Sequence, residues 1–137
     1  MITAVDLMRG LAVSIGFKVI DVPGATGYLD TDYEGKAAAA VKALREVDLV
    51  YLHVEAPDEA GHSGSVPDKI RALEDFDSRV VGPVMEGLDG LGPHRVLLVP
   101  DHATPIEIKN SQPKIEVVPE AEPEPEKKKA APKKAAK

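Results

Sequence analysis

The stretch that decides the fold is "LVYLHVEAPDEAGHSG", residues 49–64. Its first six residues form a nearly continuous apolar run, which is typical of a parallel strand buried on both faces. The run leads into a polar segment bounded by glycine, predicted to be a loop, which holds Asp58, Glu59 and His62. An Asp-x-x-x-His pair at such a place is either the start of a metal site or part of an ordinary polar loop. The choice depends on what else the fold brings to the same place.

Helical and strand patterns alternate on both sides of this stretch. A cap-like Thr3 and Gly16 bound a helix over 3–16, with Val5, Met8, Ala12 and Ile15 on one face, and an alanine-rich run predicts a second helix over 35–47. Besides 49–54, strands are predicted at "KVIDV" (18–22) and "RVLLVP" (95–100). Because the connections are too long for hairpins, the strands should be parallel with right-handed crossovers. The predicted fold class is therefore three-layer α/β with a mostly parallel sheet.

A third, long helix is predicted to start after Ser65. Asp68 three residues later and Pro67 in the first turn are the residues that favour a helix start there. Pro83 interrupts the helix, and we expect a bend because proline removes a backbone donor. The apolar stripe of this helix comprises Ile70, Leu73, Phe76, Val80, Val84 and Leu88.

Three loops are predicted to leave the carboxyl ends of the strands, where open α/β sheets bind ligands. They are "PGATGYLDTDYEG" (23–35), 56–64 and "DHATP" (101–105), and the first lacks the phosphate-loop pattern. Two Asp/His pairs thus fall at one sheet edge. The candidate residues in these loops are Asp30, Thr31, Asp32, Asp58, Glu59, His62, Asp101 and His102.

Carboxylate oxygen with imidazole nitrogen is a ligand set for Zn²⁺ and Mn²⁺, and the absence of cysteine excludes thiolate sites. The alternative is that Asp58 is a turn or helix-capping residue and His62 an exposed loop histidine. Of the other two histidines, His53 is predicted to be a packed, hydrogen-bonded core residue and His94 to be exposed.

Composition narrows the class of protein. The 137 residues fit one domain, and with three Tyr, two Phe and no Trp we expect an aliphatic core. The lack of cysteine indicates a reducing compartment, here the cytoplasm. No apolar run reaches the roughly 20 residues of a membrane-spanning helix, and a net charge of −6 argues against nucleic-acid partners. Residues 113–137, a Glu/Pro block and then a Lys/Ala block, are predicted to be a disordered tail.

Four blocks in order carry a resemblance to a known family: "VPGATGYLDTDYEGKA", "VYLHVEAPDEAGHSG", "KIRALEDFDSRVVGPV" and "LLVPDHATPI". They resemble the archaeal-type cofactor-independent (2,3-bisphosphoglycerate-independent) phosphoglycerate mutases of the alkaline phosphatase superfamily, over nearly all of 1–109. The resemblance implies an alkaline-phosphatase-like core, conversion of 3-phosphoglycerate to 2-phosphoglycerate, two divalent ions (Mn²⁺, Mg²⁺ or Zn²⁺) and a covalent phosphoserine.

The resemblance also implies which residues hold metal. Asp58 and His62 would bind one ion, with a later third histidine, while Asp101 and His102 would bind the other, with the nucleophilic serine and an upstream aspartate. The chain resembles only the C-terminal part of the catalytic domain: the serine and upstream aspartate have no counterpart, and no histidine follows His102. We therefore expect residues 1–112 to be an incomplete metalloenzyme domain with no catalytic nucleophile, weakly held metal and no activity alone.

Two alternatives stay open at the level of the sequence. The chain could be a fragment of a homoserine kinase-like phosphotransferase, since relatives on the same metal core carry such activities, or a non-catalytic partner module that pairs through an exposed sheet edge. The expected partners are phosphoglycerate or a similar phosphorylated small molecule and a complementary N-terminal fragment. Neither a membrane nor a nucleic acid is expected.

Overall fold

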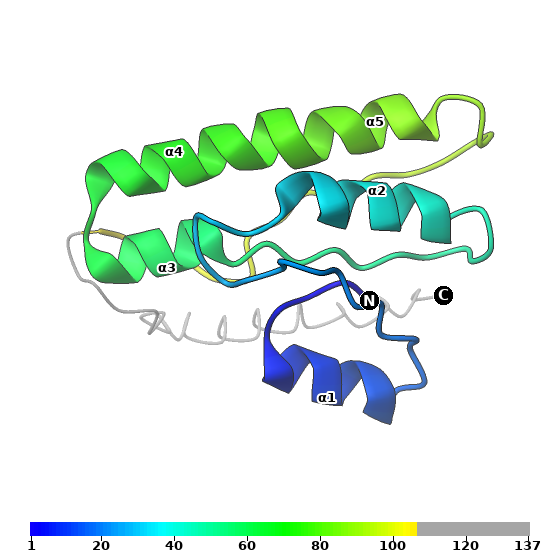
Figure 1. Cartoon of the computed structure of the whole chain (residues 1–137), viewed down its shortest axis with the longest axis horizontal. Helices are drawn as coiled ribbons and strands as arrows, with labels where there is room; N and C mark the ends of the chain where they lie inside the picture. The colour runs from blue at the N-terminus through cyan, green and yellow to red at the C-terminus, as the bar shows by residue number, and fades with distance from the viewer. Residues whose placement is uncertain (107–137) are drawn as a thin grey trace, which may run out of the picture.

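The structure is a computed structural model in which residues 1–106 are described. In Figure 1, extended segments run through the middle of the molecule, with α1 on one side and α2, α4 and α5 on the other. The predicted boundary at residue 112 and the charged tail at 113–137 lie outside the described residues. The elements are α1 (Asp6–Ser14), α2 (Tyr33–Ala43), α3 (Ala56–Ser63), α4 (Val66–Phe76), a π-helical turn η1 (Asp77–Val81) and α5 (Gly82–Leu88).

The predicted parallel sheet is not formed as such within residues 1–106. A single parallel bridge joins Ile2 to Leu52. The Ile2 N–H donates to the Tyr51 carbonyl (2.8 Å), and the His53 N–H donates to the Ile2 carbonyl (2.9 Å). On the other side, the Met1 terminal amine donates to the Lys18 carbonyl (2.7 Å). The segments at 1–2, 18–20 and 51–53 therefore lie side by side, but the pairing is too short to make strands.

The segment "RVLLVP", predicted to be a buried strand, is exposed and forms no strand. Leu97 is 83% exposed and Val99 is 68% exposed. Leu49 and Tyr51, in the other run predicted to be buried on both faces, are also exposed. The physical reason is that such a strand is covered only when neighbouring strands and helices lie on all sides, and in 1–106 those neighbours are missing.

The predicted helices are present, with some ends shifted. Ser65 is the N-cap of α4, as predicted, and its side chain accepts a hydrogen bond from the Asp68 N–H. Helix α2 begins two residues before the predicted start, because Asp32 caps it by accepting from the Gly35 N–H. Acceptance of one otherwise unpaired donor is what makes Ser and Asp strong helix starts.

The prediction for α1 was wrong at both ends. Its N-cap is Val5, which makes no side-chain cap bond. The Thr3 hydroxyl lies within 3.1 Å of the His53 Nδ1 and accepts from the Val5 N–H, so Thr3 links this turn to the central segments. On the predicted apolar face Ala12 is buried but Ile15 is exposed. Ile15 caps the end of α1 and stays exposed within 1–106.

Pro83 does not end the long helix, and Figure 1 shows α4 and α5 as one continuous rod. The helix accommodates Pro83 through the π turn η1, in which the Gly82 N–H donates to the Asp77 carbonyl five residues back. Such a turn shifts the hydrogen-bond register of the helix beside Pro83, which has no N–H to donate. Of the predicted stripe, Val80 and Leu88 are buried, whereas Ile70 and Leu73 are about half exposed.

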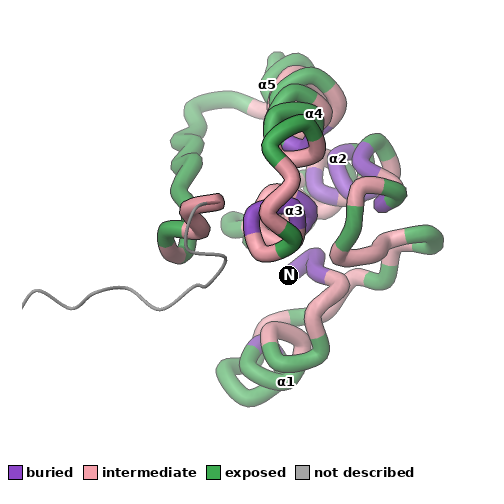
Figure 2. Tube along the Cα trace, turned by 90° about the vertical axis from the view of Figure 1, so that its left-hand side faces the viewer, coloured by how far each residue is buried: buried purple, intermediate pink, exposed green. Residues whose placement is uncertain are grey.

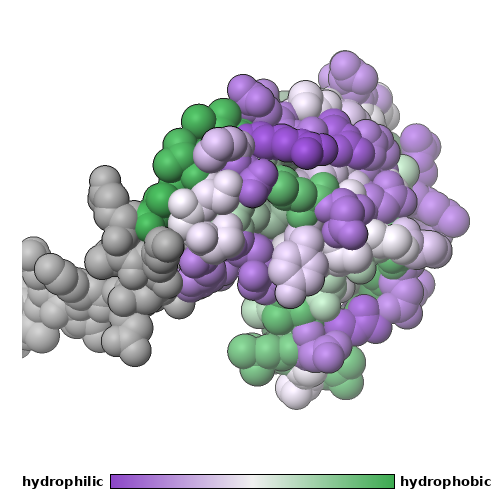
Figure 3. Space-filling model, turned by 60° about the vertical axis from the view of Figure 1, so that its left-hand side comes forward, coloured by the Kyte–Doolittle hydropathy of each residue, from purple (hydrophilic) through white to green (hydrophobic). Residues whose placement is uncertain are grey.

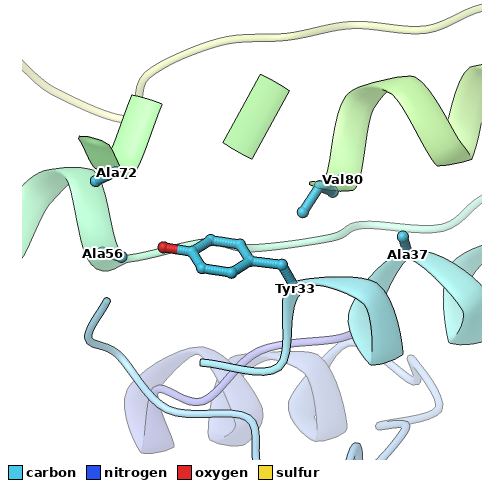
Figure 4. Close-up of a cluster of buried hydrophobic side chains, with 5 residues drawn as sticks. All are labelled: Tyr33, Ala37, Ala56, Ala72 and Val80. Atoms are coloured by element: carbon cyan, nitrogen blue, oxygen red, sulfur yellow. The ribbon is translucent and has the colours of Figure 1, made fainter. Parts of the chain in front are cut away.

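The core is small and, as expected, mostly aliphatic, but its central cluster is built around one aromatic residue, Tyr33. Tyr33 is fully buried, and Figure 4 shows its ring lying among α2, α3 and the long helix with its hydroxyl directed toward Ala56. That hydroxyl has no hydrogen-bond partner among the described residues. The buried cluster comprises Tyr33, Ala37, Ala56, Ala72 and Val80, with Leu29, Leu52, Val54, Phe76 and Val84 packed against it.

One charged residue is also fully buried. The Lys36 ammonium donates to the carbonyls of Thr26 (3.3 Å) and His53 (3.4 Å). Burial lowers the pKa of Lys36, because desolvation penalises the charged form, and the carboxylates of Glu55 and Asp32 oppose this in part. Lys36 therefore ties α2 to the central segments at an electrostatic cost.

We expect this cost to appear as a rise of stability with pH. The unfolded chain keeps the Lys36 proton up to pH about 10.4, while the folded chain releases it at lower pH. Between those two values the unfolded state binds more protons, so stability increases with pH. Urea unfolding of the wild type and Lys36→Met between pH 7 and 10 measures this, with the difference between the two curves isolating Lys36. Parallel curves would show that the lysine is not desolvated.

Candidate metal centre

The segment "APDEAGHS" is helix α3, which corrects its prediction as a loop. Pro57 lies in the first turn, where its missing donor costs nothing. Asp58 and Glu59 lie in the same turn, where carboxylates favour the positive end of the helix dipole. The helix ends at Gly64, whose φ of 74° is the left-handed conformation that glycine adopts readily. Gly64, one of the glycines that indicated a loop, therefore marks the end of a helix.

The helix fixes the geometry of the first Asp/His pair. Residues four apart lie on one face of a helix, one turn above the other. The His62 Nε2 accordingly lies 3.2 Å from an Asp58 carboxylate oxygen, and both side chains are about a quarter to a third exposed. The predicted pair therefore exists as a contact, held by helix periodicity rather than by a tight loop.

The segment after 95–99 brings the second pair to the same carboxylate. The His102 Nδ1 lies 3.8 Å from the other Asp58 oxygen, and the His102 Nε2 lies 3.6 Å from Asp101. The Thr104 hydroxyl donates to Asp58 at 2.8 Å. The four residues predicted to be metal ligands thus form one connected cluster with Asp58 at its centre.

A close backbone approach makes this cluster possible. A Cβ atom added to Gly61 would lie 2.9 Å from the Thr104 carbonyl oxygen and 3.0 Å from the Thr104 Cβ. Only glycine leaves room for residues 101–104 to lie against α3 at this distance. The Lys69 ammonium donates to the Pro57 carbonyl at 2.6 Å, so α4 is tied to α3 beside the same contact.

Negative charge accumulates around the cluster. Burial raises the pKa of Glu55, and the nearby carboxylates of Glu59 and Asp58 raise it further. Burial lowers the pKa of His53, while Asp101 opposes that shift. The His102 Nδ1 is buried and has no hydrogen-bond partner among residues 1–106. Crowded carboxylates and an unpaired ring nitrogen are the surroundings that a cation would satisfy.

The carboxylate and imidazole groups of the cluster are suitable metal ligands, but there are too few of them for a complete site. Within the described residues, no three His, Asp or Glu side chains are arranged to hold one ion together. Each Asp/His pair supplies one oxygen and one nitrogen donor, whereas a complete catalytic zinc site uses three protein ligands. The arrangement is therefore that of two half-sites that share the Asp58 carboxylate as a neighbour.

The remaining candidate residues make local contacts that stabilise their own segments. The Asp30 carboxylate accepts from the Thr26 hydroxyl (2.7 Å), the Thr31 hydroxyl accepts from the Thr26 N–H, and Asp32 caps α2. Glu59 lines a different surface hollow of about 390 Å³, together with Asp30. None of these residues joins the Asp58 cluster.

The other two histidines lie as their sequence contexts predicted. His53 is partly buried and bonded to Thr3, and His94 is exposed with its Nδ1 3.0 Å from the Gly92 carbonyl. Sequence reasoning missed Thr104 as a partner of Asp58. The sequence carries no local signal for this contact, because 46 positions separate the two residues.

Comparison with known proteins agrees with this chemistry. Residues 1–136 match the Metalloenzyme superfamily, and the chain belongs to that superfamily. Over 110 residues it is 64% identical to the 2,3-bisphosphoglycerate-independent phosphoglycerate mutase of Methanothrix thermoacetophila, covering 80% of this chain and 28% of that protein. Over 109 residues it is 59% identical to a probable mutase of the same name from Geobacter sulfurreducens, covering 80% of this chain and 27% of that protein.

A solved structure gives the same picture. The structure of the PH0037 protein from Pyrococcus horikoshii matches 80% of this chain and 28% of its own with a TM-score of 0.63 at 31% identity. The two mutases named above confirm the resemblance to cofactor-independent phosphoglycerate mutases, and the chain spans little more than a quarter of their length. Among residues 1–106, none of the helices has the length and the apolar composition of a membrane span.

Proposed function

We propose that this chain is the metal-ligand-bearing part of a phosphoglycerate mutase that interconverts 3-phosphoglycerate and 2-phosphoglycerate. The observation that carries the proposal is the Asp58 cluster, in which the Asp/His pair of α3 and the pair at 101–102 meet. The identity of 64% to a named mutase supports the choice of reaction. Glycolytic chemistry and the absence of cysteine favour a cytoplasmic location.

The proposed division of ligands follows the two pairs. Asp58 and His62 would hold one divalent ion, and Asp101 and His102 the other, with Mn²⁺, Mg²⁺ or Zn²⁺ as candidates. Such ions neutralise charge on a transferring phosphoryl group when bound. The residues of this chain supply orientation: Thr104 holds one Asp58 oxygen, and α3 holds His62 one turn away from Asp58.

Ser63 and Ser65, the serines nearest in sequence to Asp58 and His62, do not offer a nucleophile. The Ser63 hydroxyl donates to the Ala60 carbonyl at 2.8 Å, and Ser65 caps α4. Neither lies in a contact with the Asp58 cluster, and a phosphoserine route needs an activated oxygen beside the metal ligands. We therefore assign the nucleophile and the missing ligands to the part of the mutase that this chain does not match.

The test is an enolase-coupled mutase assay with Mn²⁺ present. It compares the chain alone, the remainder of the Methanothrix thermoacetophila mutase alone, and the two together. We expect no 2-phosphoglycerate from either alone and partial turnover from the mixture, because a histidine is still lacking after His102. Robust metal-dependent turnover by the chain alone would contradict the proposal, since it would require a nucleophile among its own residues. A mixture that stays inactive while the two parts bind each other would also count against it.

A further inference from the structure

The two oxygens of the Asp58 carboxylate have different neighbours. Oδ1 accepts a hydrogen bond from the Thr104 hydroxyl at 2.8 Å and lies 3.8 Å from the His102 Nδ1. Oδ2 lies 3.2 Å from the His62 Nε2. The hydroxyl takes up a lone pair of Oδ1 and fixes the rotation of the carboxylate. Asp58 therefore faces His62 with Oδ2, while Thr104 holds Oδ1.

The distance on the Oδ2 side suits two ligands of a single small ion. Bonds from such an ion to carboxylate oxygen and imidazole nitrogen are about 2.0–2.2 Å long, so neighbouring ligand atoms lie about 3.0–3.6 Å apart. The 3.2 Å between the Asp58 Oδ2 and the His62 Nε2 falls in this range. An ion between these two atoms would take one oxygen from Asp58, because Thr104 engages the other.

Contacts with α3 hold Thr104 in place. Its hydroxyl donates to Asp58, and a Cβ atom added to Gly61 would lie 2.9 Å from its carbonyl oxygen and 3.0 Å from its Cβ. Residues 92–101 are all exposed, and Figure 2 shows them as a tube that stands off from the helices. Figure 3 shows apolar side chains, such as those at 96–99, gathered beside the grey residues. Thr104 therefore fastens the segment 101–104 to Asp58.

We propose that Thr104 is a positioning residue that sets the ion preference of the half-site formed by Asp58 and His62. The inference rests on the function proposed above. By holding Oδ1, the Thr104 hydroxyl makes Asp58 a one-oxygen ligand. Ca²⁺ is large, takes six to eight oxygen ligands and often binds both oxygens of a carboxylate, whereas smaller ions need fewer ligands at shorter distances. The contact therefore favours Mn²⁺ over Ca²⁺.

The experiment compares the affinities of the full chain for Mn²⁺ and Ca²⁺ by calorimetric titration. Thr104→Val removes the hydroxyl but keeps the Cβ and the carbonyl that pack against Gly61, and Thr104→Ser keeps the hydroxyl. In Thr104→Val the freed Oδ1 can join a Ca²⁺ ion, while Mn²⁺ loses an oriented ligand. We expect the ratio of Mn²⁺ to Ca²⁺ affinity to fall about tenfold in Thr104→Val and to stay within about twofold of wild type in Thr104→Ser.

Thr26→Val is the matched control. The Thr26 hydroxyl also donates to a carboxylate, that of Asp30, at 2.7 Å, but this contact lies outside the Asp58 cluster. Its loss should leave the ratio of the two affinities unchanged. Circular dichroism of each variant checks that the fold is kept.

A purely structural role of Thr104 would weaken the binding of both ions equally, and an unchanged ratio in Thr104→Val would overturn the inference. A ratio in Thr104→Ser as low as in Thr104→Val would also overturn it, because the hydroxyl would then not be the cause. Mn²⁺ binding with an unchanged ratio rejects only the role of Thr104, whereas no binding of either ion by the wild type rejects the proposed function as well. The expected change of ratio, found beside an inactive mixture in the mutase assay, would keep the role of Thr104 and reject the mutase reaction.

Discussion

Tyr33→Ala is expected to lower the free energy of unfolding by about 3–5 kcal/mol, the range for removing a large aromatic side chain from a core. Tyr33 is fully buried, and the other members of its cluster are three alanines and Val80, which cannot move in to fill the space. The cavity should therefore stay open. Urea unfolding followed by circular dichroism gives the value, and a loss below about 1 kcal/mol would show that the cluster is not the core.

Tyr33→Phe is the matched control, and its expected effect has the opposite sign. The Tyr33 hydroxyl is buried without a partner in the described residues, and an unsatisfied buried polar group costs about 1–3 kcal/mol. Phenylalanine keeps the ring and removes that cost, so stability should be unchanged or higher. A loss with Tyr33→Phe comparable to that with Tyr33→Ala would mean that the hydroxyl is bonded.

Gly61→Ala is expected to separate residues 101–104 from α3. The added Cβ would lie 2.9 Å from the Thr104 carbonyl oxygen and 3.2 Å from the Lys69 ammonium. Because the first neighbour is backbone, the segment must move, and His102 and the Thr104 hydroxyl lose contact with Asp58. We expect Mn²⁺ affinity to fall by about 10–100-fold, the usual effect of disturbing groups that orient metal ligands.

A second helical glycine provides the control. Gly10 in α1 has nothing within 4 Å of an added Cβ, so Gly10→Ala should raise stability by about 0.5–1 kcal/mol through helix propensity and leave Mn²⁺ binding unchanged. Calorimetric titration of both variants separates the effects. Equal Mn²⁺ affinities in Gly61→Ala and Gly10→Ala would show that the close packing of Thr104 against Gly61 does not support Mn²⁺ binding.

Helices α2 and α4 could be predicted from the sequence because their signals are local. Ser65 and Asp68 mark the start of α4, and an alanine run marks α2, whatever surrounds them. The sheet could not be read in the same way. The apolar run at 95–99 indicates a strand buried on both faces, but burial depends on neighbours, and residues 1–106 do not provide them.

The four residues predicted to be metal ligands lie close together, but their binding of metal stays a prediction, and the contacts that support them were not predicted. Asp58 and His62 stand out by spacing, and that spacing suits a helix as well as a loop, which is why α3 was missed. Contacts across 46 positions, such as that of Thr104 with Asp58, leave no local pattern. The role of Gly61 in admitting the later segment likewise follows only from the packed structure.

The central claim is that Asp58, His62, Asp101 and His102 are metal ligands, and calorimetric titration with Mn²⁺ tests it most directly. The wild type is compared with the double variant His62→Ala, His102→Ala and with His94→Ala, an exposed histidine outside the cluster. We predict weak binding by the wild type, the same isotherm for His94→Ala, and little or no binding by the double variant. Indistinguishable isotherms for the wild type and the double variant would contradict the account.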